Sequence, residues 1–346
     1  MRQTDVVIIG AGPCGLFQVF ELGLQGLKAV VIDSLDRAGG QCINLYPGKP
    51  VYDIPAIPAI SAEDLTGRLL SQIAPFEPEF FFNETVAGIY GDAGAFQVSC
   101  TSGLRIQAKA VVIASGAGAF KPVQLKLAGI DVLRERSLFY QVKCPEQHRD
   151  KHVVILGGGD SALDWALQLE KIAASITLIH RTDRFRAQPA SVKKMMQLCS
   201  DLKMQFFQGR VVEYSALQGE LKSIKVAGRD GIVRRMELDH LLVFFGLSAT
   251  SKQFGQWQLE QQFNQIVVDT QRFGTSREGI YAVGDINWYP GKRKLILSGF
   301  HEAALAAFAI KEQLLPGKKA YLQYTTTSPL MHQRLGVHPD ISDLID

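Results

Sequence analysis

The sequence lacks any closely spaced pair of cysteines. Its cysteines are Cys14, Cys42, Cys100, Cys144 and Cys199. This odd number, with neither a CxxC nor a metal-knuckle spacing, fits a reducing compartment and predicts no metal site. Cys42 follows a Gly-Gly turn, where a redox-active disulfide could begin, but the position five residues later is Pro47.

The sequence also lacks a large excess of charge of either sign, and it lacks long apolar runs. A net charge of +3 over 346 residues is too small to indicate binding to nucleic acid or to a membrane surface. No run approaches the roughly 18 apolar residues that a membrane span needs. The opening MRQTDVVIIGAGP breaks at a Gly/Pro turn, unlike a signal peptide. We therefore expect a cytoplasmic protein that binds neither nucleic acid nor membranes.

The chain does contain a dinucleotide-binding pattern at its start. The buried strand DVVIIG enters GAGPCG, with Gly10, Gly12 and Gly15, and a segment with helical spacing follows. A second strand ends at Asp33, 21 residues beyond Gly12. In this pattern the glycines allow a tight turn, the approach of a pyrophosphate to the helix N-terminus, and close helix packing. The acid accepts a hydrogen bond from a ribose hydroxyl.

The same pattern returns at residue 153 with the opposite charge at the ribose end. The strand VVILG leads into GGGDSA, with Gly157, Gly159, Asp160 and Ser161. Beyond the next strand lies HRTDRFR, which carries Arg181, Arg184 and Arg186 in place of the acid. Arginines bind a 2′-phosphate, whereas an acid suits a free 2′-hydroxyl. The second copy is therefore predicted to prefer NADP(H), and the first a dinucleotide without that phosphate.

Both copies continue with short alternating strands, FQVSC and LRIQA in the first and ELKSIKVAG and IVRRMEL in the second. Each copy ends in an apolar strand, AVVIASG or LLVFFG. This duplication predicts an α/β fold of two Rossmann-like, three-layer ββα units. A further strand, GIYAVGDI, delivers Gly284 and Asp285 and precedes a basic run at 292–294. This run is most simply a solvated turn, and docking of an acidic carrier is the alternative. The N-terminus of the Ala-rich helix that follows would favour negative charge.

These residues resemble the flavoprotein family that includes thioredoxin reductase, over nearly the whole chain. Within it, the sequence is most similar to the ferredoxin/flavodoxin–NADP reductases. The specific motifs are LYPGKPVYDIPA (45–56), GAGAFKP (116–122), GGGDSALDWA (157–166), LSGFHEAA (297–304) and YTTTS (324–328). The resemblance implies FAD bound by residues 1–118 and 250–346, and NADPH bound by an inserted domain at 119–249. It also implies a homodimer in which the C-terminal segment covers the partner's flavin.

The resemblance also implies roles for single residues. Gln41 lies on the flavin side of the pyrophosphate, Asp285 contacts the ribityl chain, and the backbone of Val86 meets the adenine. Tyr46 and Tyr324 stack on the flavin, with Thr326 near its N5, although either tyrosine could instead be a core aromatic. The implied FAD contacts are Gly10, Gly12, Gly15, Asp33, Gly40, Gln41, Tyr46, Asp53, Val86, Phe120, Asp285 and Thr326. The implied NADPH contacts are Gly157, Gly159, Asp160, Ser161, Arg181, Arg184 and Arg186.

The sequence departs from thioredoxin reductases before the second glycine loop, where KCPEQHRDK carries Cys144 alone. Without a dithiol, the flavin is predicted to pass electrons to a one-electron carrier, ferredoxin or flavodoxin, without acid–base residues. The second departure is Thr182, because the 2′-phosphate motif usually has an arginine there.

Three alternatives remain open. Cys14 lies in the first turn of a helix, where the dipole lowers a thiol pKa, and could serve a reductase of small-thiol disulfides such as bacillithiol disulfide. A pyrophosphate at the same helix end would oppose such a thiolate. The chain could also be a thioredoxin-reductase-like diaphorase. A flavin-holding or redox-sensing protein without turnover is the third alternative, and the arginine-bearing second site argues against it.

Overall fold

The computed structural model describes residues 2–45, 50–116, 120–249, 257–316 and 324–337. The chain divides into two compact units. The first contains Met1–Ala119 and Ala249–Asp346, and the second contains Phe120–Ser248. Both ends of the chain thus build the first unit, and the second is an insertion. Among the described residues, no helix is long and apolar enough to cross a bilayer.

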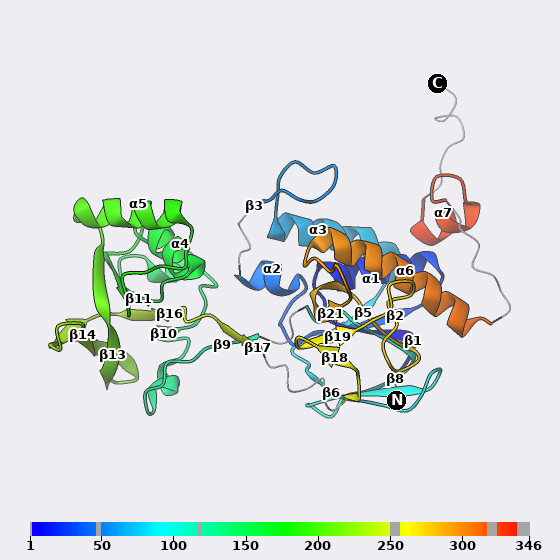
Figure 1. Cartoon of the computed structure of the whole chain (residues 1–346), viewed down its shortest axis with the longest axis horizontal. Coiled ribbons are helices and arrows are strands. Elements are labelled where there is room, and N and C mark those ends of the chain that lie inside the picture. The colour runs from blue at the N-terminus through cyan, green and yellow to red at the C-terminus, as the bar shows by residue number, and fades with distance from the viewer. Residues whose placement is uncertain (1, 46–49, 117–119, 250–256, 317–323, 338–346) are drawn as a thin grey trace, which may run out of the picture. The chain divides into compact units, whose positions relative to one another are not determined.

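A seven-stranded sheet forms the core of the first unit (Figure 1). Its strands are β1 (Arg2–Ile9), β2 (Ala29–Ile32), β5 (Glu79–Phe81), β6 (Val86–Tyr90), β7 (Phe96–Cys100), β8 (Arg105–Ile113) and β20 (Ile280–Ala282). The order is β5-β2-β1-β8-β7-β6, with β20 also beside β8. Strands β5, β2, β1, β8 and β20 run parallel, while β6, β7 and β8 form an antiparallel meander. Val6 to Ile9 are buried, as a parallel strand covered on both faces requires.

Strand β8 differs from the sequence-based expectation. LRIQA and AVVIASG were expected as two strands, but Arg105–Ile113 forms one. No glycine or proline interrupts it, so the backbone stays extended. Its first half pairs with β7 and its last three residues pair with β20, while β1 runs along its length. One strand thereby carries both the meander and the parallel core.

Three helices pack together beside this sheet: α1 (Pro13–Leu24), α3 (Ala62–Ile73) and α6 (Ile296–Leu314), with α1 against both others (Figure 1). Helix α3 begins where the Ser61 side chain accepts a hydrogen bond from Asp64 N at 3.0 Å. Leu65, Leu69 and Ile73 lie four residues apart and are buried. The smaller elements are α2 (Gly40–Leu45), β3 (Pro50–Val51), β4 (Ile60–Ser61), η1 (Ala74–Phe76), β18 (Gln261–Gln262), β19 (Gln265–Val267), η5 (Gly284–Ile286), β21 (Asn287–Trp288) and α7 (Pro329–Leu335).

The second unit repeats this plan. Its sheet has the order β10-β16-β11-β12-β13-β14-β15, in which the first five strands are parallel and the last three antiparallel. The strands are β10 (Leu138–Phe139), β11 (His152–Leu156), β12 (Ser175–His180), β13 (Gln205–Leu217), β14 (Glu220–Gly228), β15 (Val233–Glu237) and β16 (His240–Val243). Helices α4 (Asp160–Leu169) and α5 (Pro189–Ser200) pack together beside it (Figure 1). Two 3-10 turns, η2 (Ile130–Leu133) and η3 (Pro145–His148), complete it.

The predicted α/β fold with two Rossmann-like units is confirmed. In each unit a parallel strand enters a glycine loop, a helix and a neighbouring parallel strand. The fifth parallel strand differs, because β20 follows the glycine loop in the chain whereas β10 precedes its own. The inserted unit begins with β9 (Phe120–Pro122) and ends within β17 (Leu247–Ala249). These two strands form a two-stranded sheet. Next to them, Val123 N donates to Gly246 O at 3.0 Å.

A buried histidine pair should make the second unit sensitive to acid. His148 is fully buried, and its Nδ1 lies 2.9 Å from Nδ1 of His240. Burial, with the charge of His240 as a smaller cause, lowers the pKa of His148 to about 4. The unfolded chain therefore binds the proton first. Proton binding by His148 therefore lowers the free energy of unfolding by up to about 3 kcal/mol as the pH falls from about 6.5 towards 4. Above about pH 6.5 this loss is absent.

The test is chemical denaturation of the wild type and of His148→Gln at pH 7.5 and pH 4.5. We expect the wild type to lose more stability than the variant over this interval. Glu21, whose pKa burial raises to about 7, titrates in the opposite sense in both proteins and cancels in the comparison. Equal losses in the two proteins would contradict the prediction.

Candidate functional site

Two glycines of the first loop differ in what surrounds them. A methyl group on Gly15 would lie 1.9 Å from the Gly10 carbonyl oxygen, so α1 can pack onto the loop only without a side chain there. Gly12 caps α1 with ordinary extended backbone, and a methyl group on it would find nothing nearer than Gly40 Cα at 3.9 Å. Gly15 therefore serves packing, whereas Gly12 leaves space at the helix N-terminus.

Two further loops contact the first glycine loop at the ends of strands β1 and β8. Gly39 N donates to Ala11 O at 2.8 Å, and a methyl group on Gly40 would approach Gly12 Cα to 2.9 Å. A methyl group on Gly116 would lie 3.0 Å from Gln41 Nε2. The predicted residues Gly10, Gly12, Gly40 and Gln41 are thus brought together around one helix end, where backbone N–H groups favour a phosphate.

A buried hydroxyl that the sequence-based reasoning missed lies at the same place. Ser115 Oγ is buried and has no hydrogen-bond partner among the described residues. Its Cα would lie 3.0 Å from a methyl group on Gly10, so it belongs to this loop cluster. An unpaired buried hydroxyl costs stability unless a ligand or water completes it. Its signal in the sequence was the small-residue run that ends AVVIASG.

Asp33 lies at the end of β2, as the spacing predicts, and is 8% exposed. Its Oδ2 accepts from Ala11 N at 2.6 Å and its Oδ1 accepts from Leu35 N at 2.8 Å. Burial raises the pKa of Asp33, although these backbone donors act in the opposite direction. A carboxylate has about four lone-pair sites, so capacity for a ribose hydroxyl remains. The glycine cradle, the open helix end, Ser115 and Asp33 together fit an adenine dinucleotide.

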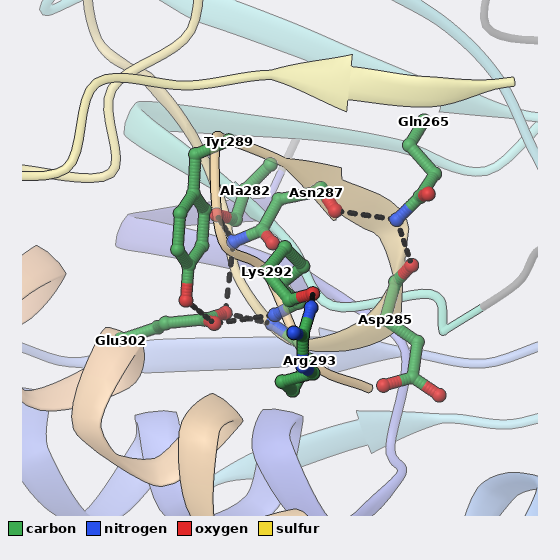
Figure 2. Close-up of polar contacts among 9 residues, drawn as sticks. Gln265, Ala282, Asp285, Asn287, Tyr289, Lys292, Arg293 and Glu302 are labelled. Atoms are coloured by element: carbon green, nitrogen blue, oxygen red, sulfur yellow. Dashed lines mark hydrogen bonds and ion pairs between the residues drawn. The ribbon is translucent and has the colours of Figure 1, made fainter. Parts of the chain in front are cut away.

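A second cluster surrounds Glu302, a buried charge on α6 that the sequence-based reasoning did not select (Figure 2). Its Oε2 accepts from Gly284 N at 2.7 Å and from Asn287 Nδ2 at 2.8 Å. Its Oε1 accepts from Tyr289 OH at 3.0 Å and from Lys292 Nζ. The expectation that Lys292 belongs to a solvated turn is wrong, because its side chain is 5% exposed and forms this ion pair. Its neighbours Arg293 and Lys294 are exposed.

Cys14 lies between the two clusters. Methyl groups on Gly284 and Gly299 would lie 3.1 Å and 2.1 Å from its Sγ. Burial raises the pKa of the Cys14 thiol to about 12, and the charges of Asp285 and Glu302 act in the same direction. A thiol with so high a pKa is protonated at neutral pH, which argues against Cys14 as a nucleophile.

The second glycine loop leaves its helix end open in the same way. Gly159 caps α4, and a methyl group on it would meet nothing within 4 Å. Asp160 Oδ1 accepts from Gln188 N at 2.8 Å, which fixes the neighbouring loop, and Ser161 is exposed. At Gly158 a methyl group would lie 2.4 Å from His180 Nε2, so that histidine packs against the loop.

Arg181, Arg184 and Arg186 all lie on the exposed loop after β12. None of the three forms an ion pair with a described residue. Burial lowers the pKa of His180, and the charges of Arg181 and Arg186 lower it further. The backbone of Arg186 contacts the glycine loop, because Arg186 N donates to Gly158 O at 2.8 Å. Cations without carboxylate partners beside an open helix end suit an anionic ligand.

The other predicted residues are more scattered. Val86 is buried at the start of β6, and Asp53 is exposed after β3. Tyr46 and the Phe120 side chain lie outside the described residues. Tyr324 is 65% exposed, and Thr326 is exposed in the same turn.

Residues 328–334 hold this turn. Ser328 N donates to Tyr324 O at 3.0 Å, and His332 Nε2 bonds Thr325 O at 2.6 Å. Arg334 of α7 donates to Leu24 O, at the end of α1. The turn with Tyr324 is therefore anchored to the first unit by α7.

Residues 4–310 match the sequence profile of the pyridine nucleotide-disulphide oxidoreductases. The chain is 54% identical over 343 residues to ferredoxin–NADP reductase of Colwellia psychrerythraea, covering 99% of this chain and 98% of the relative. It is 53% identical over 342 residues to ferredoxin–NADP reductase 2 of Cupriavidus taiwanensis, covering 99% and 93%.

Solved structures share the fold at low sequence identity. Thioredoxin reductase of T. acidophilum superposes with a TM-score of 0.70 at 22% identity, covering 91% of this chain and 99% of that one. Bacillithiol disulfide reductase of Staphylococcus aureus gives a TM-score of 0.70 at 18% identity, covering 90% and 98%.

Proposed function

Because the chain belongs to the pyridine nucleotide-disulphide oxidoreductase family, we propose that it passes electrons between NADPH and ferredoxin or flavodoxin through FAD, without a redox-active disulfide. The chain is an enzyme of the oxidoreductase class. One observation carries the proposal: its relatives named ferredoxin–NADP reductase share over half of its residues along nearly the full length. The dithiol spacing of a disulfide reductase is absent from the sequence, with Pro47 five residues beyond Cys42.

In this proposal the first unit holds FAD. The open helix end at Gly12 accommodates the pyrophosphate, Asp33 accepts from the adenine ribose, and Ser115 donates its unpaired hydroxyl. Asp285, on the turn that Glu302 holds, serves the ribityl chain. When bound, FAD would take a hydride from NADPH and release electrons one at a time. The protein supplies orientation and exclusion of water, so no acid–base pair is required.

The second unit is proposed to hold NADPH. Gly157, Gly159 and Ser161 bound the pyrophosphate site, and Arg181, Arg184 and Arg186 bind the 2′-phosphate. The absence of carboxylate partners for these arginines among the described residues supports this assignment. The exposed Arg293 and Lys294 border a surface hollow lined also by Phe263 and Trp288, which supports docking of an acidic carrier there.

We further propose a cytoplasmic homodimer. Tyr324 is 65% exposed although the turn that bears it is anchored by α7. In this proposal a second copy of the chain covers that side chain. Stacking of Tyr324 and Tyr46 on flavin and the placement of Thr326 near its N5 remain part of this proposal.

The proposal is tested by identifying the flavin and following its electrons. We expect one non-covalent FAD per chain, released by heat and identified by chromatography. Mixing with NADPH in a stopped-flow instrument should bleach it within seconds, and ferredoxin or flavodoxin should restore the colour. Release of FMN, or of no flavin, would contradict the proposal, and reoxidation by a small disulfide alone would favour the alternative acceptor.

Cys14→Ala separates these two acceptor classes. Because burial holds the pKa of this thiol at about 12, we expect the variant to keep its FAD and to reduce ferredoxin at a rate within about twofold of the wild type. The measurement is steady-state reduction of ferredoxin by NADPH. Cys199→Ala, a partly exposed thiol of the second unit, is the matched control. A variant that retains FAD but loses reduction of its natural acceptor would instead make Cys14 the nucleophile.

A further inference from the structure

We propose that Glu302 and Lys292 form a charge-balanced clamp that positions the Gly284–Asp285 turn and sets the redox potential of the flavin beside it. This inference rests on the proposed function, because it concerns how the chain treats a bound flavin. It assigns a positioning role to two residues that contact the cofactor only through the turn.

The clamp holds one short segment through every acceptor position of a single carboxylate. Gly284 N, Asn287 Nδ2, Tyr289 OH and Lys292 Nζ all donate to Glu302, and together they span nine residues of chain (Figure 2). Glu302 is fully buried, and the Lys292 side chain is 5% exposed. A carboxylate with four donors in a buried site is held rigidly, because each lost bond leaves a desolvated group unpaired.

The opposite side of the segment is held as well. Gln265 Nε2 on β19 donates to Asp285 O at 3.0 Å and to Asn287 O at 2.6 Å. Asn287 Nδ2 also donates to Ala282 O at 2.9 Å. In Figure 2 the Asp285 carboxylate points away from Glu302, so the clamp fixes its backbone and leaves the side chain available. Such double fixation is what positioning to a fraction of an ångström requires.

The charges of the clamp act beyond the segment itself. Glu302 raises and Lys292 lowers the pKa of Cys14, a residue in the first turn of α1. The field of the ion pair therefore extends to the helix end at which the dinucleotide pyrophosphate is expected. With both charges present the two effects largely oppose one another. Removing either charge should leave the field of the other in a water-poor site, where it is weakly screened.

This opposition gives a signature that a purely structural role would not produce. A lone negative charge disfavours the more negative, reduced flavin, whereas a lone positive charge favours it. In Lys292→Met, the Glu302 carboxylate keeps three hydrogen-bond donors and loses its cationic partner, so the midpoint potential should fall. In Glu302→Gln, the potential should rise. Removing both charges should return it towards the wild-type value.

The experiment measures the midpoint potential of the FAD-loaded full-length protein by dye-coupled titration, together with the dissociation constant of FAD. We expect Lys292→Met to change the ratio of affinities for reduced and oxidised flavin about tenfold, which is about 30 mV for a two-electron couple. Glu302→Gln should shift it by a similar amount in the other direction, and both should bind FAD more weakly. The control is Lys109→Met, which removes the exposed Lys109–Asp5 pair of the same unit and should leave the potential unchanged.

Opposite shifts that cancel in the double variant support the inference. If Glu302→Gln does not fold, a fall in the Lys292→Met potential still supports it. Shifts of the same sign in both single variants, or no shift in Lys292→Met, would overturn it while the proposed function stands. Absence of flavin from the wild-type protein would instead overturn the proposed function itself.

Discussion

Gly12→Ala should weaken the binding of FAD by at least about a hundredfold while leaving the flavin-free protein as stable as the wild type. The space at Gly12 admits a methyl group, so the substitution should cause no steric clash in the folded protein. The same methyl group would stand where the pyrophosphate has to approach backbone N–H donors. Two lost hydrogen bonds to a charged group, at roughly 1.5–3 kcal/mol each, account for this factor. Fluorescence titration with FAD measures the loss.

Gly15→Ala is the matched variant, with the opposite pattern. Its methyl group would meet the Gly10 carbonyl oxygen at 1.9 Å, and backbone cannot move aside easily. We expect flavin-free Gly15→Ala to lose at least about 3 kcal/mol, the upper end of overpacking costs. Chemical denaturation of both flavin-free variants provides the comparison. If Gly12→Ala unfolded as easily as Gly15→Ala, the open helix end would be a packing feature and not a ligand site.

Arg181→Ala should raise the KM for NADPH by about one to two orders of magnitude and leave the KM for NADH nearly unchanged. A hydrogen bond between charged groups is worth roughly 1.5–3 kcal/mol, and each 1.4 kcal/mol is about tenfold. NADH has no phosphate at that position to lose. The maximal rate of flavin reduction should hardly change, because the contact is equal in ground and transition states. Steady-state kinetics with both nucleotides measures these constants.

The same measurement on Arg184→Ala and Arg186→Ala shows how the three residues share the phosphate. A small effect at Arg181 with a large one at Arg184 remains compatible with Thr182 standing between them. Arg229→Ala, an exposed arginine on the turn between β14 and β15, is the control. Equal losses for NADPH and NADH in all three variants would mean that the cluster serves the fold or a partner surface.

The sequence predicted those parts of the fold whose backbone conformation depends on residues close together in the chain. Glycines at fixed spacing between a buried strand and a helix require a strand–loop–helix unit, and both occur where expected. Helix α3 was not predicted although its signal was present, namely the Ser61 cap and apolar residues at 65, 69 and 73. That segment carries no functional motif, so periodicity alone would have had to identify it.

Only those site residues that belong to a sequence motif could be predicted. Lys292 stands in a run of three basic residues, which in a sequence is typical of a solvated turn. Its burial depends on the chain reversing at Pro290 and Gly291, so that the ammonium meets Glu302 ten residues later on α6. Pairing of that kind is a tertiary property and leaves no local pattern. The unpaired hydroxyl of Ser115 is of the same nature, because it is defined by what surrounds it.

The two-stranded base of the inserted unit has an evolutionary consequence. Strands β9 and β17 pair with each other, so the segment 120–248 leaves and rejoins its host at nearly the same point in space. A segment with adjacent ends can be gained, excised or exchanged between genes without stretching the host chain. The host sheet, assembled from both ends of the chain, would close over a short turn in its place. Units with different nucleotide specificities could thus be exchanged on one host unit, for which we propose FAD binding.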